Sequence, residues 1–295
     1  MSTSETLHLA RWWNSADDLK VQCCLCPRAC LIENNENGFC GVRKNIEGKL
    51  YSLSYGMPVA LNADPIEKKP LAEFMPGTKT FSIGTFGCNL DCSFCQNASL
   101  SRGAYTGASY ERYLSPEKII ELTLGHNCRS VAFTYNEPTI FAEYAIDIAK
   151  LAHAKDLRTV LVSNGYITPR AAKDLYPLID AANIDMKAFS EEFYSSMTDS
   201  HLKPVLNSIK TLYDLGKHIE VTNLVIPDKN DSMDLIDSWL DWVEENLDKQ
   251  VPLHFSAFFP THEYHLSPGT PKETLLQIKE HASSRGFTSI YLGNI

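Results

Sequence analysis

The sequence predicts an α/β fold, a partial TIM-like (β/α)6 barrel preceded by a small cysteine-rich N-terminal segment. From residue 80 onward, short β-branched or aromatic runs alternate with longer amphipathic stretches, which is typical of parallel βα units. A chain of 295 residues is long enough for one such barrel with a small appendage. The dinucleotide-binding glycine fingerprint and the phosphate-loop pattern are both absent. The pattern therefore favours a barrel over a flat doubly wound sheet, and spacing alone does not decide between them.

Each predicted strand is a short run bounded by polar or turn-forming residues. The strands fall at residues 80–85, 130–135, 158–162, 182–186, 218–226 and 253–258, with a seventh candidate at 289–292. The helices fall at residues 116–124, 139–153, 169–178, 205–215, 232–247 and 272–283. Two helices have clear start signals, because Ser115 and Thr168 can cap a helix and each precedes a proline suited to the first helical position.

The first 76 residues are predicted to be a separate region, a cysteine-rich part with a linker, and residues 77–295 the barrel core. Residues 1–20 form a polar lead-in with two tryptophans, which suggests an amphipathic helix packed on the body. Residues 45–48 are expected to form a turn between strands. The stretch 62–79 is rich in proline and charge, so we interpret it as a linker over the barrel rim.

Charge and hydropathy argue against several classes of function. The formal net charge is −9, from 27 basic and 36 acidic residues, which argues against a general nucleic-acid binder. No run of eighteen apolar residues occurs, so no membrane span is indicated. The N-terminus lacks the basic flank and apolar centre of a secretory signal. We therefore expect a cytoplasmic protein whose nine cysteines are better interpreted as metal ligands than as disulfides.

Three cysteines lie on one short loop directly after the first predicted barrel strand. Cys88, Cys92 and Cys95 have the spacing C-x3-C-x2-C. Three thiolates on a tight loop suit an iron–sulfur cluster, and a four-iron cluster held by three cysteines keeps one iron open for a small molecule. A structural zinc site would require four ligands, and no fourth cysteine or histidine lies near this loop. The loop therefore predicts a [4Fe–4S] cluster with a chemical role.

A second set of cysteines lies near the N-terminus. Cys23, Cys26, Cys30 and Cys40 are spaced C-x2-C-x3-C-x9-C, with Cys24 as an extra thiol. Four sulfurs could close a tetrahedral zinc site or bind a second iron–sulfur cluster, and the sequence leaves this choice open. A metal-free cysteine-rich fold is the weaker alternative, because so short and polar a segment has little apolar core of its own.

The three-cysteine loop, with Phe94 before its last cysteine, resembles the signature of the radical S-adenosylmethionine (radical SAM) enzymes. The segments CPRAC, GFCGVR, DPIEKKPL, GTFGCNLDCSFCQN, TYNEPT, SNGY, IDMKAF and NLVIP together resemble the AmmeMemoRadiSam-type members, relatives of the pyruvate formate-lyase activating enzymes. The resemblance implies a radical SAM barrel with a SAM-binding [4Fe–4S] cluster, a flavodoxin- or ferredoxin-like reductant, and AMMECR1-like and Memo-like proteins as partners. Relatives commonly continue into a short cysteine-containing tail, whereas this chain stops at Ile295.

In that family, one electron from the cluster splits SAM into methionine and a 5'-deoxyadenosyl radical, which abstracts hydrogen from a substrate. The resemblance therefore implies an oxidoreductase or activating-enzyme-like protein, and it names no substrate. The substrate that gives up the hydrogen atom could be a small molecule or a backbone glycine of a partner protein. A metal-binding scaffold for partner domains is the non-enzymatic alternative, but a scaffold has no need of polar residues at several strand ends.

Parallel barrels carry their reactive groups at the C-terminal ends of the strands, and polar residues occur there. By resemblance, Glu137 would pair with the SAM ammonium, although this chain has Tyr-Asn-Glu where relatives have a Gly-Gly-Glu-type motif. Ser163 and Asn164 would lie at the ribose hydroxyls, unless they only form a strand-to-helix turn. Asp185 and Lys187 share one strand face, where Lys187 could bind a carboxylate or the two could form a structural ion pair.

The last strands carry further polar residues. Glu220, Thr222 and Asn223 are expected towards the barrel mouth on one strand, and His254 and Ser256 on the next. Any of these could contact substrate. A single histidine on an aromatic-rich strand is more often a hydrogen-bonded core residue than a catalyst, so we expect that role for His254.

Overall fold

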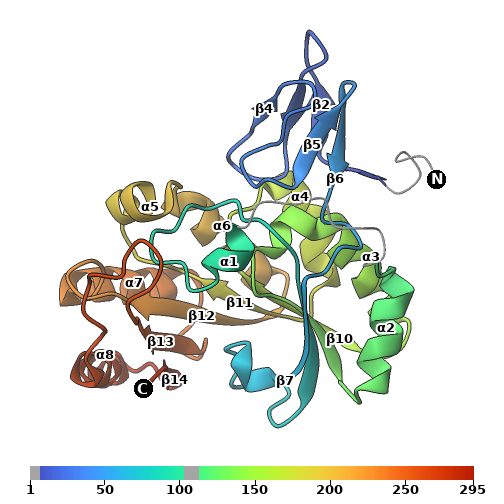
Figure 1. Cartoon of the computed structure of the whole chain (residues 1–295). Coiled ribbons are helices and arrows are strands. Elements are labelled where there is room, and N and C mark those ends of the chain that lie inside the picture. The colour runs from blue at the N-terminus through green and yellow to red at the C-terminus, as the bar shows by residue number, and fades with distance from the viewer. Residues whose placement is uncertain (1–6, 103–112) are drawn as a thin grey trace.

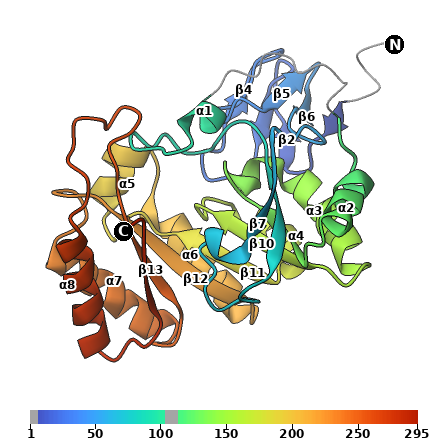
Figure 2. The ribbon, with the colours of Figure 1, turned by 60° about the horizontal axis from the view of Figure 1, so that its bottom comes forward.

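The computed structural model describes residues 7–102 and 113–295. A small β-rich unit formed by the N-terminal residues stands on one side of a larger α/β unit (Figure 1). Figure 2 shows that this N-terminal unit lies on the side of the large unit that carries the short helix α1 (Ala98–Ser101). Within the described residues, no helix has the length and apolar character needed to span a membrane.

The N-terminal unit consists of two three-stranded antiparallel sheets. One has the order β1 (His8–Leu9), β6 (Lys49–Ser52), β5 (Arg43–Ile46), and the other the order β2 (Trp13–Ser15), β3 (Val21–Cys23), β4 (Leu31–Ile32). The predicted turn between strands at 45–48 is confirmed, since β5 and β6 pair in a hairpin around Glu47 and Gly48. Both residues have positive φ, as a two-residue hairpin of this twist requires.

The predicted helix over residues 1–20 is wrong where the structure describes the chain, because β1 and β2 lie there; residues 1–6 are outside the described residues. Burial alternates along this stretch, with Ala10 and Trp12 buried and Leu9 and Arg11 exposed. A period of two is typical of an extended chain and not of a helix.

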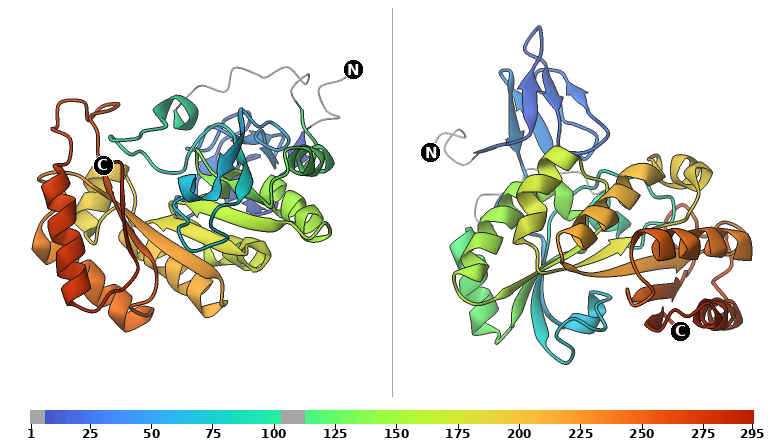
Figure 3. Two further views of the ribbon diagram at one scale, coloured as in Figure 1. Left: turned by 90° about the horizontal axis from the view of Figure 1, so that it is seen from below. Right: turned by 180° about the vertical axis from the view of Figure 1, so that it is seen from behind.

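The large sheet runs in sequence order from β7 to β14. Its strands are β7 (Ala60–Pro65), β8 (Lys79–Gly84), β9 (Ser130–Phe133), β10 (Arg158–Ser163), β11 (Ala181–Asp185), β12 (His218–Val225), β13 (Leu253–Ala257) and β14 (Ile290–Gly293). Strands β8 to β14 are parallel, and β7 is antiparallel to β8. The order never reverses, and the helices cover the outer face of a curved sheet (Figure 3). The α/β partial barrel is therefore confirmed, with the seventh strand as a full member.

The helices follow the strands as predicted, with additions. They are α2 (Pro116–Gly125), η3 (Pro138–Phe141), α3 (Ala142–His153), α4 (Pro169–Leu175), η4 (Tyr176–Leu178), α5 (Glu191–Thr198), α6 (Leu202–Asp214), α7 (Met233–Asn246) and α8 (Lys272–Ser284). The Ser115 and Thr168 side chains accept from backbone N–H groups in the first turns of α2 and α4, so both predicted caps are confirmed. Helices α1 and α5 were not predicted, although Ser190 caps α5 before two acidic residues, a recognisable start signal.

The stretch interpreted as a linker over the rim instead joins the barrel. Residues 60–65 form β7, and the segment after it, beginning with η1 (Ile66–Lys68), packs on the concave face of the sheet. Ile66 and Leu71 are fully buried against small residues of β9, β10 and β11. Asn183 Nδ2 donates to the Pro70 carbonyl at 2.7 Å. The rim prediction failed because these two apolar side chains fill the barrel interior; the domain division at residues 76 and 77 stays a prediction.

A buried ion pair joins the N-terminal unit to the barrel. Arg43 donates to both carboxylate oxygens of Glu143 on α3, at 2.7 and 2.5 Å, and to the Ile140 carbonyl at 3.1 Å. Both side chains are only 1% exposed. Thr168 Oγ1, before α4, donates to the Cys24 carbonyl at 2.8 Å. The unit is thus fixed against the helices that follow β9 and β10.

Candidate functional site

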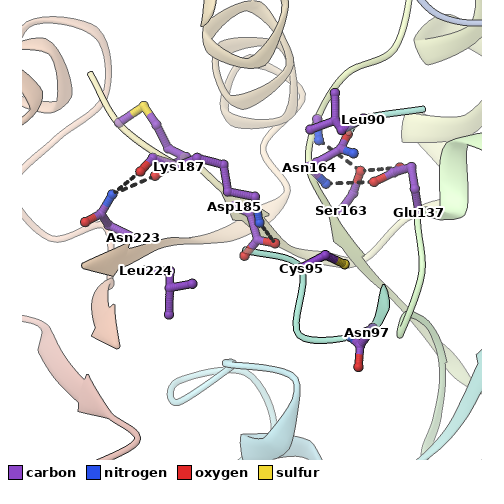
Figure 4. A network of polar contacts seen from close by, with 12 residues as sticks. Leu90, Cys95, Asn97, Glu137, Ser163, Asn164, Asp185, Lys187, Asn223 and Leu224 are labelled. Atoms are coloured by element: carbon purple, nitrogen blue, oxygen red, sulfur yellow. Dashed lines mark hydrogen bonds and ion pairs between the residues drawn. The ribbon is translucent and has the colours of Figure 1, made fainter. Parts of the chain in front are cut away.

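The three cysteines of the loop after β8 open onto one cavity of about 390 Å³. The cavity lies at the C-terminal ends of the parallel strands, where the sequence predicts the reactive groups. All eight predicted site residues of the barrel line it: Cys88, Cys92, Cys95, Glu137, Ser163, Asn164, Asp185 and Lys187. Figure 4 shows Cys95 between the Asp185–Lys187 pair and the Glu137–Ser163–Asn164 group. The fold therefore brings together residues spread over a hundred positions of sequence.

Backbone N–H groups anchor residues 85–97, which we call the cysteine loop, to helix α5. Asp91 N donates to the Thr198 carbonyl at 2.9 Å, and Ser93 N donates to the Met197 carbonyl at 3.1 Å. Both acceptors belong to the end of α5. The ring of Phe94 is buried and packs against Phe193 of the same helix, with centroids 5.7 Å apart. The unpredicted helix α5 thus supports the segment that carries the cysteines.

The donor set of the cysteine loop, three cysteine thiols, is of the kind that holds an iron–sulfur cluster. All three thiols are free. In the part of the chain that the structure describes, no three His, Cys, Asp or Glu side chains converge closely enough to ligate one metal ion. Zinc holds its sulfur ligands about 2.3 Å from one centre, whereas cysteines of an iron–sulfur cube bind different irons and stand farther apart.

Burial sets the protonation of these thiols. It raises the pKa of Cys92 to about 12, against the opposing charge of Lys187, and raises the pKa of Cys88 well above its ordinary value. The thiols of Cys88 and Cys92 are therefore protonated at neutral pH without metal, and a bound metal centre would take up the thiolates with release of protons.

Glu137 follows β9 and is 1% exposed. Its Oε1 accepts from Thr139 N at 2.8 Å and from Ser163 Oγ at 2.7 Å, and its Oε2 accepts from Asn164 N at 2.8 Å. Burial raises the pKa of this carboxyl, although the three hydrogen bonds oppose the shift. A carboxylate has about four acceptor positions, so one remains for a group in the cavity.

Ser163 is the last residue of β10 and Asn164 follows it, and both side chains already form hydrogen bonds within the protein. Besides its bond to Glu137, Ser163 Oγ accepts from Gly165 N at 3.0 Å. Asn164 Nδ2 donates to Asn89 Oδ1 at 3.0 Å and lies 3.8 Å from Cys88 Sγ. Asn164 therefore ties the end of β10 to the cysteine loop. Gly165 has φ of +69°, a conformation that favours glycine at this turn.

Asp185 and Lys187 form an ion pair with 2.7 Å between Oδ2 and Nζ. Burial opposes the charge of Lys187, but the Asp185 carboxylate raises the pKa of the ammonium above its ordinary value. The backbone carbonyl of Lys187 accepts from Asn223 Nδ2 at 2.9 Å (Figure 4) and from Asn230 Nδ2 at 2.6 Å. The predicted pair exists, and it faces the cavity with its backbone held in place.

Sequence reasoning missed the role of Tyr135, which also lines the cavity. Its φ is +72°, the left-handed region that glycine adopts easily. Its hydroxyl donates to Asp64 at 2.7 Å, and the ammonium of Lys69 lies 4.5 Å above its ring. Its carbonyl accepts from Asn97 Nδ2 at 2.7 Å. A signal was present, because Tyr135 stands where the Gly-Gly-Glu-type motif has glycine.

Asn136 is a second missed residue, and it connects two loops. Its Oδ1 accepts from Thr85 N at 2.9 Å, and its Nδ2 donates to the Gly87 carbonyl at 3.0 Å. It thereby fixes the start of the cysteine loop beside the turn that carries Glu137.

The polar residues of the last strands divide between the cavity and the core. Thr222 and Ser256 line the cavity, and Thr222 Oγ1 is buried without a hydrogen-bond partner among the described residues. Glu220 lies deeper and accepts from Ala72 N at 2.8 Å, while 2.5 Å separates its Oε2 from His254 Nε2. Glu220, Asn223 and His254 are not among the residues that line the cavity, so their contact with substrate stays a prediction, while the hydrogen-bonded core role expected for His254 is confirmed.

The N-terminal cysteines form a second group. Cys23, Cys26, Cys30 and Cys40 line one small cavity between the N-terminal unit and the barrel, whereas Cys24 is not among its lining residues and contacts Asn14. Burial raises the pKa of Cys23 to about 11 and that of Cys26 to about 12. The fold therefore gathers the four predicted thiols, although they do not converge on the position of a single ion within the described residues.

Comparisons with known proteins agree with this geometry. A family model described as the radical SAM superfamily matches residues 82–239, which include the cysteine loop. An uncharacterized protein of Methanocaldococcus jannaschii is 39% identical over 286 residues, 97% of this chain and 85% of that protein.

More distant proteins share part of the chain. The 7-carboxy-7-deazaguanine synthase of Methanothermobacter thermautotrophicus is 28% identical over 152 residues, 51% of this chain and 57% of that protein. The structure of Streptococcus suis SuiB bound to the precursor peptide SuiA superposes with a TM-score of 0.57 and 13% identity, over 72% of this chain and 47% of that one. The second likeness concerns the fold alone.

Proposed function

The chain belongs to the radical SAM superfamily, and we propose that Cys88, Cys92 and Cys95 hold a [4Fe–4S] cluster that binds S-adenosylmethionine. With both groups bound, their chemistry is the reductive cleavage of SAM to a 5'-deoxyadenosyl radical that abstracts hydrogen from a substrate. The observation that carries the proposal is the shared cavity, in which three free thiols of one loop face polar residues from the next three strands.

The residues around the cavity divide the binding of SAM between them. Glu137 would present its remaining acceptor position to the ammonium, and Lys187, with Asp185 beside it, would attract the carboxylate. Ser163 and Asn164 would lie beside the ribose hydroxyls, with their side chains held by bonds to Glu137 and Asn89. Because the protein already fixes these side chains, they would hold the bound molecule in one orientation.

Anaerobic reconstitution with iron, sulfide, SAM and a reductant tests the proposal. We expect a four-iron cluster at the cysteine loop and 5'-deoxyadenosine formation, and both should be lost in Cys92→Ala whatever metal the N-terminal cysteines hold. The matched control is Cys128→Ala, which removes a buried thiol outside the cavity and should retain both. Wild-type protein that holds no four-iron cluster, or product equal in Cys92→Ala and wild type, would contradict the proposal.

Within the superfamily we assign the chain to the AmmeMemoRadiSam-type members. The support is the order of the motifs, which extends from Cys26 in CPRAC to Ile226 in NLVIP. This assignment proposes AMMECR1-like and Memo-like proteins as partners and a flavodoxin- or ferredoxin-like protein as reductant. Co-purification of the tagged chain with each candidate, compared with the Cys92→Ala variant, tests these partners. The proposal leaves the hydrogen-donating substrate unidentified, with a backbone glycine of a partner protein as the alternative.

A second metal, zinc or iron–sulfur, is proposed at Cys23, Cys26, Cys30 and Cys40. The support is that these four free thiols line one small cavity. Replacing all four by alanine should lower bound metal without abolishing the SAM cluster, and elemental analysis should identify which metal is lost. The matched control is Cys24→Ala, since Cys24 lies in the same unit but outside the cavity. Unchanged metal content and stability in the four-alanine variant would remove the second site.

A further inference from the structure

One residue of the N-terminal unit reaches the cysteine loop directly. Arg28, from the CPRAC segment, donates from Nε to the carbonyl of Asn89, the residue that follows Cys88. Its Nη1 donates to Asp199 Oδ2 at 2.9 Å and its Nη2 to the Asp199 carbonyl at 2.6 Å. The guanidinium thus bridges the cysteine loop and the end of α5, the two segments already joined through Asp91.

The position of Arg28 is itself fixed. Its guanidinium lies 3.3 Å from the centroid of the Phe39 ring, and its side chain is 13% exposed. A planar cation stacked on an aromatic face loses little further freedom when it donates in its own plane. Phe39 also belongs to the N-terminal unit, so the unit presents the guanidinium in a prepared orientation.

A second guanidinium holds the next turn of the loop. Arg102 donates to the Leu90 carbonyl at 2.8 Å and pairs with Asp91, and it lies 5.8 Å from the same Phe39 ring. Consecutive carbonyls of the cysteine loop, at residues 89 and 90, therefore each accept from an arginine. Charge-assisted hydrogen bonds are about twice as strong as neutral ones, so this segment is held more firmly than an ordinary loop.

Arg28 also places its positive charge beside the cysteine loop, in hydrogen-bond contact with the residue that follows Cys88. Positive charge near an iron–sulfur cluster stabilises its reduced form, which carries one more negative charge, and therefore raises the reduction potential. Arg28 can thus affect both where the cysteines stand and how easily a bound cluster accepts an electron.

We infer that Arg28 is a positioning residue for the cysteine loop, so that the N-terminal unit is part of the radical-generating site and not an appendage. The inference rests on the proposed function, because it takes Cys88, Cys92 and Cys95 as cluster ligands. It gives the CPRAC segment a role that does not depend on metal at its own cysteines.

Hydrogen exchange on the metal-free full-length chain tests the positioning role. In Arg28→Gln, amides of residues 89–93 should exchange about tenfold faster or more, because a charge-assisted anchor of the loop is lost. Arg28→Lys should restore part of the protection, and Asp199→Asn should show a smaller rise in the same peptides. The control is Arg170→Gln, an exposed arginine at the start of α4.

The reconstituted protein supplies a second measurement. The midpoint potential of the cluster should become more negative in Arg28→Gln and remain near the wild-type value in Arg28→Lys. Unchanged exchange at residues 89–93, or a rise of equal size throughout β10 to β12, would overturn the inference; if Arg28→Gln does not fold, Arg28→Lys and Asp199→Asn decide it. Failure of the wild type to hold a cluster would instead overturn the proposed function. The hydrogen-exchange data on the metal-free chain would still test the positioning role of Arg28.

Discussion

Ser163 Oγ donates a 2.7 Å hydrogen bond to Glu137 Oε1, which joins the ends of two neighbouring strands beneath the cysteine loop. The same carboxylate accepts from the backbone N–H groups of Thr139 and Asn164. Glu137 is therefore a structural acceptor as well as a proposed ligand of SAM. The two roles can be measured separately, because unfolding experiments report the structural role and titration with SAM reports the ligand role.

We expect Glu137→Gln to lower the free energy of unfolding by about 1–3 kcal/mol, because the new amide cannot accept from all three donors. Ser163→Ala should cost about 1 kcal/mol, since it removes a single bond. Urea unfolding measures both, and calorimetric titration with SAM should show a larger loss of affinity in Glu137→Gln. The control is Glu192→Gln, an exposed residue of α5. Equal SAM affinity in Glu137→Gln and wild type would rule out the ligand role.

Tyr135 provides a test of backbone conformation. Its φ of +72° favours glycine, so Tyr135→Gly should be more stable than Tyr135→Ala by about 1 kcal/mol, although glycine has the smaller side chain. Tyr135→Phe should lose about 1 kcal/mol relative to wild type, because Asp64 then loses the phenolic donor. Thermal and urea unfolding of the three variants measure these differences. A Tyr135→Ala protein as stable as Tyr135→Gly would show that the turn does not keep its left-handed conformation.

The fold could be predicted in large part because its strongest signals are local. Strands such as β9 are buried on both faces, so they form continuous apolar runs that stand out between amphipathic helices. The site was predictable because parallel strands bring their C-terminal ends to one edge. The residues that hold the site in place were not predictable, since Arg28 meets Asn89 across 61 positions of sequence. The segment after β7 was misinterpreted because its charge and proline content conceal two buried apolar side chains.

Glu220 should make stability depend on pH in the acid range. Despite burial, bonds from His218, His254 and the backbone of Ala72 and Glu73 lower the pKa of this carboxyl from 4.5 to about 2. A carboxyl with a lowered folded-state pKa stabilises the fold above the unfolded pKa, and this contribution disappears as pH falls through the folded pKa. The shift corresponds to about 3 kcal/mol at neutral pH, lost progressively from about pH 5 to pH 2.

The measurement is the free energy of unfolding from pH 7 to pH 2 for wild type and Glu220→Gln. The difference between the two should be largest at neutral pH and should vanish near pH 2, where Glu220 itself becomes protonated. Glu245→Gln provides a control on α7, because no hydrogen bond to the side chain of Glu245 occurs in the described structure. A difference that stays constant with pH would mean that the carboxylate charge does not contribute.

The pair formed by Arg43 and Glu143 should behave as a buried ion pair. Removal of either partner should lower the free energy of unfolding, because the remaining charge is then buried without its counter-charge. Both side chains are 1% exposed, so Arg43→Met leaves a buried carboxylate without its cation and should cost about 3–5 kcal/mol. Replacing Glu143 by Leu in the same chain removes that carboxylate, so the double variant should recover much of the loss. The exposed pair of Lys118 and Glu121 is the control, where Lys118→Met should change stability by less than about 1 kcal/mol. Additive losses in the double variant would mean that the two side chains stabilise the interface independently, and the N-terminal unit would then be held by its other contacts.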